Sequence, residues 1–125
     1  MSILRLIRGL PGSGKTTLAK NMEGFYHVEA DMFFVQTNGK YVFSPQKLGI
    51  AHDWCQLKAA QALERGENVV VSNTFVKKWE LQPYLKMAEK LGADVEIITA
   101  KGEFKNEHNV PDAVLQRMRA SWEEL

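Results

Sequence analysis

The stretch GLPGSGKTT, residues 9–17, constrains the fold more than any other part of the chain. It satisfies the Walker A pattern GxxxxGK(S/T) in full; it follows the apolar run ILRLI and precedes LAKNM, whose spacing is helical. In this pattern the glycines allow the backbone to curl, so that successive N–H groups point at phosphate oxygens. The sequence therefore predicts a strand, a phosphate-binding loop and a helix, in that order.

Composition is that of an ordinary globular chain. The length of 125 residues predicts one domain, spanning residues 1–125. The content of 45% hydrophobic and 25% charged residues excludes the disordered and membrane classes. A net charge of +1 lacks the basic excess of a general nucleic-acid binder, so any nucleic-acid contact is expected to be local, at a site.

Cysteine use and hydropathy predict a cytosolic protein without membrane contact. Cys55 is the single cysteine, which excludes an intramolecular disulfide and favours a reducing compartment. No apolar run approaches the roughly 18 residues of a membrane span, and no signal-peptide layout precedes the first strand pattern.

β-rich runs and helical segments alternate along the chain. The runs predicted as strands are 3–7, 26–30, 68–72 and 94–99, and the segments predicted as helices are 15–22, 45–65, 77–91 and 111–124. Ser44 with Pro45 marks a helix start, and Gly66 and Gly92 mark helix stops. This order predicts a three-layer α/β P-loop fold, with a small parallel sheet of about four strands and helices on both faces. Asn38 with Gly39 predicts a small β-hairpin or ordered loop over residues 33–43.

The predicted ligand of the loop is ATP with Mg²⁺. Lys15 would bring a positive charge to the β- and γ-phosphates, and the hydroxyl of Thr16 is placed to bind the metal. A P-loop alone does not distinguish a kinase from a motor or a switch, but the short chain favours a small kinase. The predicted nucleotide-binding residues are Gly9, Leu10, Pro11, Gly12, Ser13, Gly14, Lys15, Thr16 and Thr17.

Five stretches carry a resemblance to a known family. They read RGLPGSGKTTLA, VEADMFF, NGKYVFSPQKLGIAHDWCQLKAAQAL, VVVSNTF and KKWELQPYLKMAEKLG, and they extend from Leu4 to about Glu123. This chain resembles the P-loop kinase family that includes phage polynucleotide kinase and the kinase-like domain of NEDD4-binding protein 2, with phage and bacterial ATP-binding relatives. The resemblance implies ATP-dependent transfer of the γ-phosphoryl group to a hydroxyl, with the 5′-hydroxyl of a polynucleotide as the acceptor.

The resemblance implies that Asp31 is the general base. A carboxylate at the carboxyl end of a strand beside the P-loop strand could reach the space beyond the γ-phosphate, where the acceptor hydroxyl loses its proton. Asp31 could instead only cap the following loop. Glu29 competes for the role: it is expected on the same side of the strand as Asp31 but deeper within it.

In the resembling family a segment after the fourth strand, called the lid, carries an arginine that covers the transferring phosphates. Here the lid departs from that pattern. Matching HNVP of this chain to HGVP of the family puts Lys105 where the family has an arginine, which keeps the charge but loses the bidentate fork. With Lys15 and Asp31, Lys105 completes the predicted catalytic set. Lys101, Arg117 and Arg119 are further candidates for neutralising the phosphates, and a solvated surface charge is the alternative for each.

Two more departures concern the metal and the acceptor. Residues 72–75 read SNTF, where relatives usually carry an aspartate, so the metal would rest on Thr16, water, the nucleotide and, as a further option, Asp31. Phe34 stands where the phage enzyme has an arginine three residues beyond its base. The first departure predicts weaker metal binding or lower turnover, and the second predicts altered recognition of a charged acceptor end.

Some of the remaining residues allow two interpretations, and others only one. His52 and Trp54 belong to the AHxW signature of the family, and His52 is either a core histidine or a substrate contact, whereas Cys55 is expected in the core. Phe33, Phe34 and Tyr41 could stack a base of the acceptor or could pin their own loop. Trp79 and Trp122 are expected to pack in the interior.

Two other functions stay open. One is a kinase for a small molecule or a modified nucleoside, which the near-neutral charge and Phe34 suggest. The other is a catalytically weak ATP-binding module acting through a protein partner, which could also complete the lid.

Overall fold

Four parallel strands form the centre of the protein, in a computed structural model that describes residues 2–102 and 110–125. They are β1 (Ile3–Arg8), β2 (Phe25–Val28), β3 (Asn68–Asn73) and β4 (Asp94–Thr99). Their order in the sheet is β2-β3-β1-β4, and every neighbouring pair is parallel. The predicted parallel sheet is confirmed.

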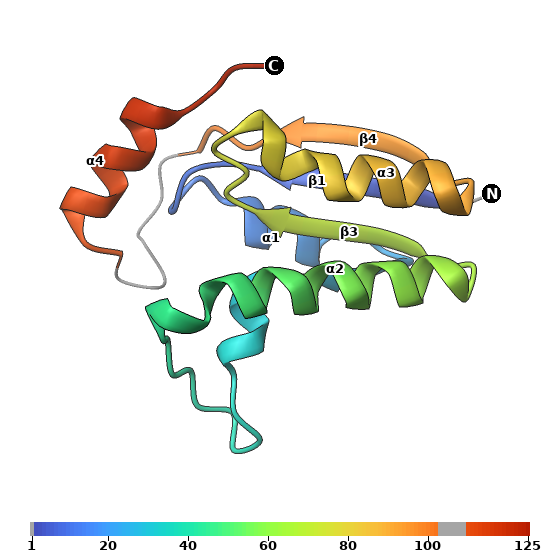
Figure 1. Cartoon of the computed structure of the whole chain (residues 1–125), viewed down its shortest axis with the longest axis horizontal. Coiled ribbons are helices and arrows are strands. Elements are labelled where there is room, and N and C mark those ends of the chain that lie inside the picture. The colour runs from blue at the N-terminus through green and yellow to red at the C-terminus, as the bar shows by residue number, and fades with distance from the viewer. Residues whose placement is uncertain (1, 103–109) are drawn as a thin grey trace.

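Helices cover both faces of this sheet. α2 (Leu48–Glu64) and α3 (Gln82–Leu91) pack on one face and on each other, while α1 (Lys15–Lys20) packs on the opposite face (Figure 1). α4 (Asp112–Ser121) lies beyond the carboxyl ends of the strands. Three 3₁₀ segments complete the order: η1 (Ala30–Phe34), η2 (Pro45–Lys47) and η3 (Lys78–Leu81). None of the helices so described is long and apolar enough to cross a membrane.

The core follows from the alternation of side chains along the strands. Leu4 and Leu6 of β1 lie with α2 and α3, while Ile7 lies with α1, and all three are fully buried. The face that α2 turns to the sheet is made of small residues, which lets the helix approach the strands closely. The buried residues of that face include Ala51, Cys55, Ala59 and Ala62. The prediction that Cys55 belongs to the core is confirmed.

The structure confirms the predicted signals for helix ends more closely than the predicted signal for a helix start. Gly66 and Gly92 follow α2 and α3 with φ of 82° and 70°, the left-handed conformation that favours glycine. Pro45 opens a short 3₁₀ segment instead of α2, and the Ser44 hydroxyl donates to Gln46 Oε1 at 3.1 Å instead of capping a backbone N–H.

The segment between β2 and α2 is an ordered loop, as predicted. Val35 and Tyr41 form an antiparallel bridge, with Gly39 at the turn. Phe34 is only 5% exposed and makes edge contacts with Phe33 and with Phe43. These contacts support the interpretation in which the loop is pinned by its own aromatic rings.

Arg8, at the end of β1, is fully buried and anchors the C-terminal segment. Its guanidinium donates to the carbonyl of Phe75 at 2.7 and 3.1 Å and to the carbonyl of Glu123 at 2.7 Å. It also lies 4.0 Å from the ring centre of Trp122. Packing of Trp122 is thus confirmed, but Trp79 is 70% exposed, so the prediction that it packs in the interior is wrong.

Replacing this anchor should destabilise the whole fold. Arg8→Met leaves the carbonyls of Phe75 and Glu123 without a donor, and each unsatisfied buried group costs about 1–3 kcal/mol, so the free energy of unfolding should fall by about 2–4 kcal/mol. Urea unfolding followed by circular dichroism measures it. Arg65→Met is the matched control, because Arg65 pairs with Glu67 at the surface and should matter by less than about 1 kcal/mol. Equal effects of the two substitutions would contradict the anchoring role.

Candidate functional site

The P-loop has a backbone that its glycines make possible. Gly12 and Gly14 have φ of 83° and 87°. A Cβ at Gly9 would lie 2.3 Å from Ser13 Oγ and 3.0 Å from the carbonyl oxygen of Ala100. The loop therefore closes tightly on itself and leaves no space for a side chain at its first position.

Neighbouring strand ends hold the loop in place. The N–H of Gly9 donates to the carbonyl of Thr74 at 3.2 Å, just after β3, and the N–H of Gly102 donates to the carbonyl of Ser13 at 3.0 Å, just after β4. Ser13 Oγ is buried and makes no hydrogen bond within the part of the chain that the structure describes. A half-buried loop with an unsatisfied buried hydroxyl and inward-curled glycines fits a polar ligand such as a phosphate chain.

Two cavities flank the P-loop. The first, of about 420 Å³, lies on the β4 side, between Thr17 with Leu18 and the segment from Ile98 to Gly102. The second, of about 660 Å³, lies on the side of β2, α2 and α4. Gly14 and Thr17 line both cavities, so the predicted phosphate site lies between them.

The second cavity brings together most of the predicted site. Lys15, Thr16 and Asp31 line it, and so do His52 from α2 and Arg117 from α4. The half-buried position of His52 on this wall supports the substrate-contact interpretation over that of a core histidine. Of the other predicted cations, Lys101 lines the first cavity and Arg119 is exposed outside both; Lys105 lies outside the described residues.

Sequence reasoning missed several apolar residues of the second cavity. Phe43 comes from the loop before α2, and α4 contributes Val114 and Met118 together with Arg117. Spacings of three and four residues put the α4 members on one helical face, which is the signal that could have identified them. Phe43 is 47% exposed, whereas Phe34 is buried, so Phe43 is the more accessible ring of this loop.

Asp31 lies in η1, just beyond β2, and faces the second cavity. The Tyr41 hydroxyl donates to Asp31 Oδ1 at 3.2 Å. Burial, with the charge of Asp31, raises the pKa of Tyr41 to about 12, so the phenol stays protonated and keeps donating at neutral pH. This contact orients the carboxylate without neutralising it.

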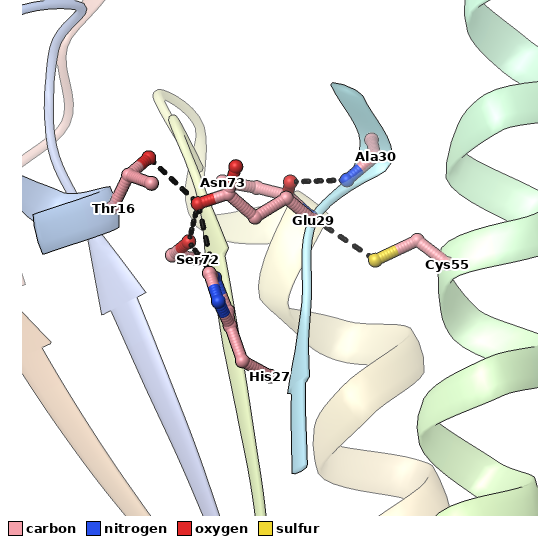
Figure 2. Close-up of polar contacts among 7 residues, drawn as sticks. All are labelled: Thr16, His27, Glu29, Ala30, Cys55, Ser72 and Asn73. Carbon is pink, nitrogen blue, oxygen red and sulfur yellow. Dashed lines mark hydrogen bonds and ion pairs between the residues drawn. The ribbon is translucent and has the colours of Figure 1, made fainter. Parts of the chain in front are cut away.

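Glu29 is buried at the end of β2 and is the centre of a polar cluster with Thr16, His27 and Ser72 (Figure 2). The Thr16 hydroxyl donates to Glu29 Oε2 at 2.6 Å, and Ser72 Oγ donates to the same oxygen. His27 Nε2 lies 3.1 Å from both Glu29 Oε2 and Ser72 Oγ. Burial alone would raise the pKa of Glu29, but the hydrogen bonds from His27, Ser72 and Thr16 together lower it. Glu29 therefore faces Thr16 as a carboxylate. It lies one residue beyond β2, which ends at Val28.

Asn73, the last residue of β3, has a structural role instead of an acidic one. Its Oδ1 accepts from the N–H of Ala30 at 2.9 Å, and its Nδ2 donates to Cys55 Sγ at 3.6 Å (Figure 2). Asn73 thereby ties η1, which carries Asp31, to the buried face of α2.

The described residues offer oxygen ligands for a nucleotide-bound metal, not a site that holds one alone. Within residues 2–102 and 110–125 no group of three or more His, Cys, Asp or Glu side chains could hold a metal ion. The Thr16 hydroxyl and the Glu29 carboxylate meet on the wall of the second cavity beside Lys15. Hydroxyl and carboxylate oxygens suit Mg²⁺, which is usually held by few protein groups together with substrate phosphates. These residues fit the predicted metal.

A parallel sheet with a Walker A loop at the carboxyl end of its first strand is typical of P-loop nucleotide-binding proteins. The sequence matches the family described as AAA domain over residues 4–125, and the chain belongs to this family. Human NEDD4-binding protein 2 is 37% identical over 94 residues, which are 70% of this chain and 5% of that protein. The predicted family resemblance is confirmed.

Solved structures of kinases share the fold. The Pnkp1/Rnl/Hen1 RNA repair complex contains a chain that matches 96% of this one with a TM-score of 0.72 and 18% identity, over 43% of its own length. A sugar kinase from Janibacter matches the whole chain with a TM-score of 0.69 and 18% identity, over 80% of its own length. An APS kinase from Mycobacterium tuberculosis, in complex with AMPPNP and APS, matches 95% of this chain with a TM-score of 0.63 and 19% identity, over 74% of its length. At these identities the structures show the kinase-like P-loop fold alone, and the two that are named as kinases, of a sugar and of APS, differ in their acceptor.

The closure of the P-loop predicts the effect of one added methyl group. Gly9→Ala puts a Cβ onto Ser13 Oγ and the carbonyl of Ala100, so the loop must open and nucleotide affinity should fall roughly tenfold or more, which is about 1.4 kcal/mol. Titration with a fluorescent ATP analogue measures the affinity. Gly49→Ala is the control: it lies in α2, nothing is within 4 Å of its Cβ position, and binding should not change. Unchanged affinity in the Gly9 variant would show that the loop tolerates the extra atom.

The buried thiol of Cys55 should be inert in the folded protein. Burial raises the pKa of Cys55, so at pH 8 it remains a protonated thiol, whereas in the unfolded chain it begins to ionise, and only the thiolate reacts. Labelling with a disulfide reagent should be slower in the native protein than in 8 M urea by at least about 100-fold, since it requires local opening. Fast native labelling would mean that the buried face of α2 that carries Cys55 separates readily from β3.

Proposed function

We propose that this protein transfers the γ-phosphoryl group of ATP to a hydroxyl, with the 5′-hydroxyl of a polynucleotide as the acceptor. The observation that carries the proposal is the position of the P-loop between two cavities, one of which also contains Asp31. A donor nucleoside would occupy the cavity on the β4 side, its phosphates the loop from Gly9 to Thr17, and the acceptor the cavity on the β2 side.

The residues of the second cavity supply the groups that such a transfer needs. The acceptor oxygen attacks the γ-phosphorus, the bond from the γ-phosphorus to the β–γ bridging oxygen breaks, and ADP leaves. Asp31 takes the proton of the hydroxyl, and Lys15 with Arg117 offsets the charge that develops on the phosphoryl oxygens. Mg²⁺ bound with the nucleotide would be held by Thr16 and would supply further charge neutralisation.

Support for a polynucleotide acceptor comes from the relatives. The family resemblance includes polynucleotide kinase, and one of the fold neighbours belongs to an RNA repair complex. Both are properties of those proteins, and the chain spans less than half of that neighbour and a small part of the human relative.

The lining of the second cavity favours a second candidate, a small-molecule or nucleoside acceptor. Phe43, Leu48, Val114 and Met118 give it a largely apolar wall, on which a base or another flat apolar group could pack. Phe34, at the position where the phage enzyme has an arginine, is buried and contributes no charge.

Removing the base should abolish transfer but not nucleotide binding. We expect Asp31→Asn to lower the rate of phosphoryl transfer by about 10²–10⁴-fold, the contribution of a general base, with ATP affinity within about twofold of the wild type. The assay follows label from γ-labelled ATP to 5′-hydroxyl DNA and RNA oligonucleotides, to free nucleosides, and to no acceptor. Asp53→Asn, an exposed carboxylate of α2, is the control and should transfer at the wild-type rate.

The acceptor that becomes labelled decides between the candidates. Labelled oligonucleotides support the polynucleotide kinase, and acceptor affinity should then fall steeply with salt. Labelled nucleosides alone support the small-acceptor kinase, whose affinity should hardly depend on salt. Tight ATP binding without transfer to any acceptor would overturn both and favour an ATP-binding module that acts through a partner.

A further inference from the structure

The carboxyl end of β3 lacks the acid that the resembling family usually carries there. Ser72 and Asn73 are both neutral, and Asn73 is engaged with Ala30 and Cys55. A metal held by Thr16 and by the nucleotide alone would have no carboxylate beside it on this strand.

The neighbouring strand supplies a carboxylate at the same place. β2 pairs with β3 in parallel register, with Val28 opposite Val71, so the next residues, Glu29 and Ser72, are adjacent across the pair. Ser72 Oγ donates directly to Glu29 Oε2, and Thr16 Oγ1 donates to the same oxygen at 2.6 Å (Figure 2). The residue after β2, instead of β3, thus supplies the carboxylate partner of the Thr16 hydroxyl.

The hydrogen bonds of Glu29 leave half of its carboxylate available. The contacts from Thr16, Ser72 and His27 all go to Oε2, and Oε1 makes no hydrogen bond to the described residues. Glu29 is 6% exposed and lines the second cavity beside Lys15 and Thr16. A purely structural buried carboxylate is expected to satisfy both oxygens, because an unpaired buried charge is costly. The open oxygen is therefore available to a polar ligand in the cavity.

We propose that Glu29 replaces the missing acid of β3 as the carboxylate of the metal site. Its Oε2 accepts the hydrogen bond of the Thr16 hydroxyl, which leaves the lone pairs of Thr16 Oγ1 for the metal, and its Oε1 would accept a hydrogen bond from a water bound to the metal. His27 and Ser72 are positioning residues that fix the carboxylate. This inference rests on the proposed binding of ATP with Mg²⁺ at the P-loop, and it separates the roles of the two neighbouring acids: Glu29 serves the metal and Asp31 the acceptor.

The test measures metal binding apart from turnover. Affinity for a non-hydrolysable ATP analogue is determined by calorimetry in EDTA and across a Mg²⁺ titration, and Mn²⁺ bound in the ternary complex is counted by electron paramagnetic resonance. Glu29→Gln should weaken the metal by about 10–100-fold, the usual effect of losing a partner of a metal ligand, while affinity in EDTA stays within about twofold. Glu23→Gln, an exposed carboxylate, and Asp31→Asn should leave metal affinity unchanged.

Two further variants keep the result interpretable. Glu29→Asp keeps the buried charge, but its shorter side chain places the carboxylate farther from Thr16. It should give a smaller loss of metal affinity, with thermal stability close to that of the wild type. Adding Ser72→Asp to Glu29→Gln returns an acid to β3 and should restore part of the metal affinity. Wild-type metal affinity in both Glu29 variants, or equal loss of nucleotide affinity with and without metal, would overturn the role of Glu29. Absence of nucleotide binding by the wild type in either condition would instead overturn the proposed function.

Discussion

The structure depends on polar side chains buried where the parallel strands end. The buried polar and charged side chains of the described residues are Arg8, Ser13, Glu29, Ser72 and Asn73. All of them lie at the carboxyl edge of the sheet or in the loop that follows it, while the rest of the interior is apolar. Away from water such groups need polar partners, and the requirement is strictest for the two charges, Arg8 and Glu29. Their partners are backbone carbonyls and side chains from segments distant in sequence, so satisfying them fixes how those segments meet.

Arg8 and Glu29 connect the strands to distant segments on two sides of the sheet. Glu29 joins β2 to the P-loop through Thr16, and Arg8 joins β1 to the C-terminal segment through Glu123 and Trp122. The second connection spans 115 residues and holds the segment that follows α4. α4 in turn places Arg117 and Met118 on the wall of the second cavity. Arg8, which precedes the Walker A pattern by one residue and lines neither of the two cavities, thus helps to shape the second cavity.

Local patterns predicted the parts that local physics determines. The Walker A loop, the alternation of strands and helices, the stops at Gly66 and Gly92 and the burial of Cys55 all follow from residues within a few positions of one another, and the structure confirms them. The Glu29 cluster and the Arg8 anchor could not be predicted in this way. Apart from His27, two residues from Glu29, their partners lie 13 to 115 residues away and are brought together by the sheet. Glu29 was expected inside a strand over residues 26–30, but β2 ends at Val28, so Glu29 follows the strand, where it accepts a hydrogen bond from Thr16.

The charges of the second cavity also define how a polynucleotide could be held. Lys15 and Arg117 are the cations among its described lining residues, and Lys15 is assigned to the phosphates of the donor. Arg117 is then the cation left inside the cavity for a phosphate of the acceptor. One contact to a single strand changes log K by only about 0.7 per tenfold change in salt. A steeper dependence would require cations outside the cavity, and the exposed Lys40 and Lys47, on either side of the cavity residues Tyr41 and Phe43, are placed to provide them. The steepness of the salt dependence would therefore show how far the acceptor extends beyond the cavity, because each additional phosphate contact increases the slope by a similar amount.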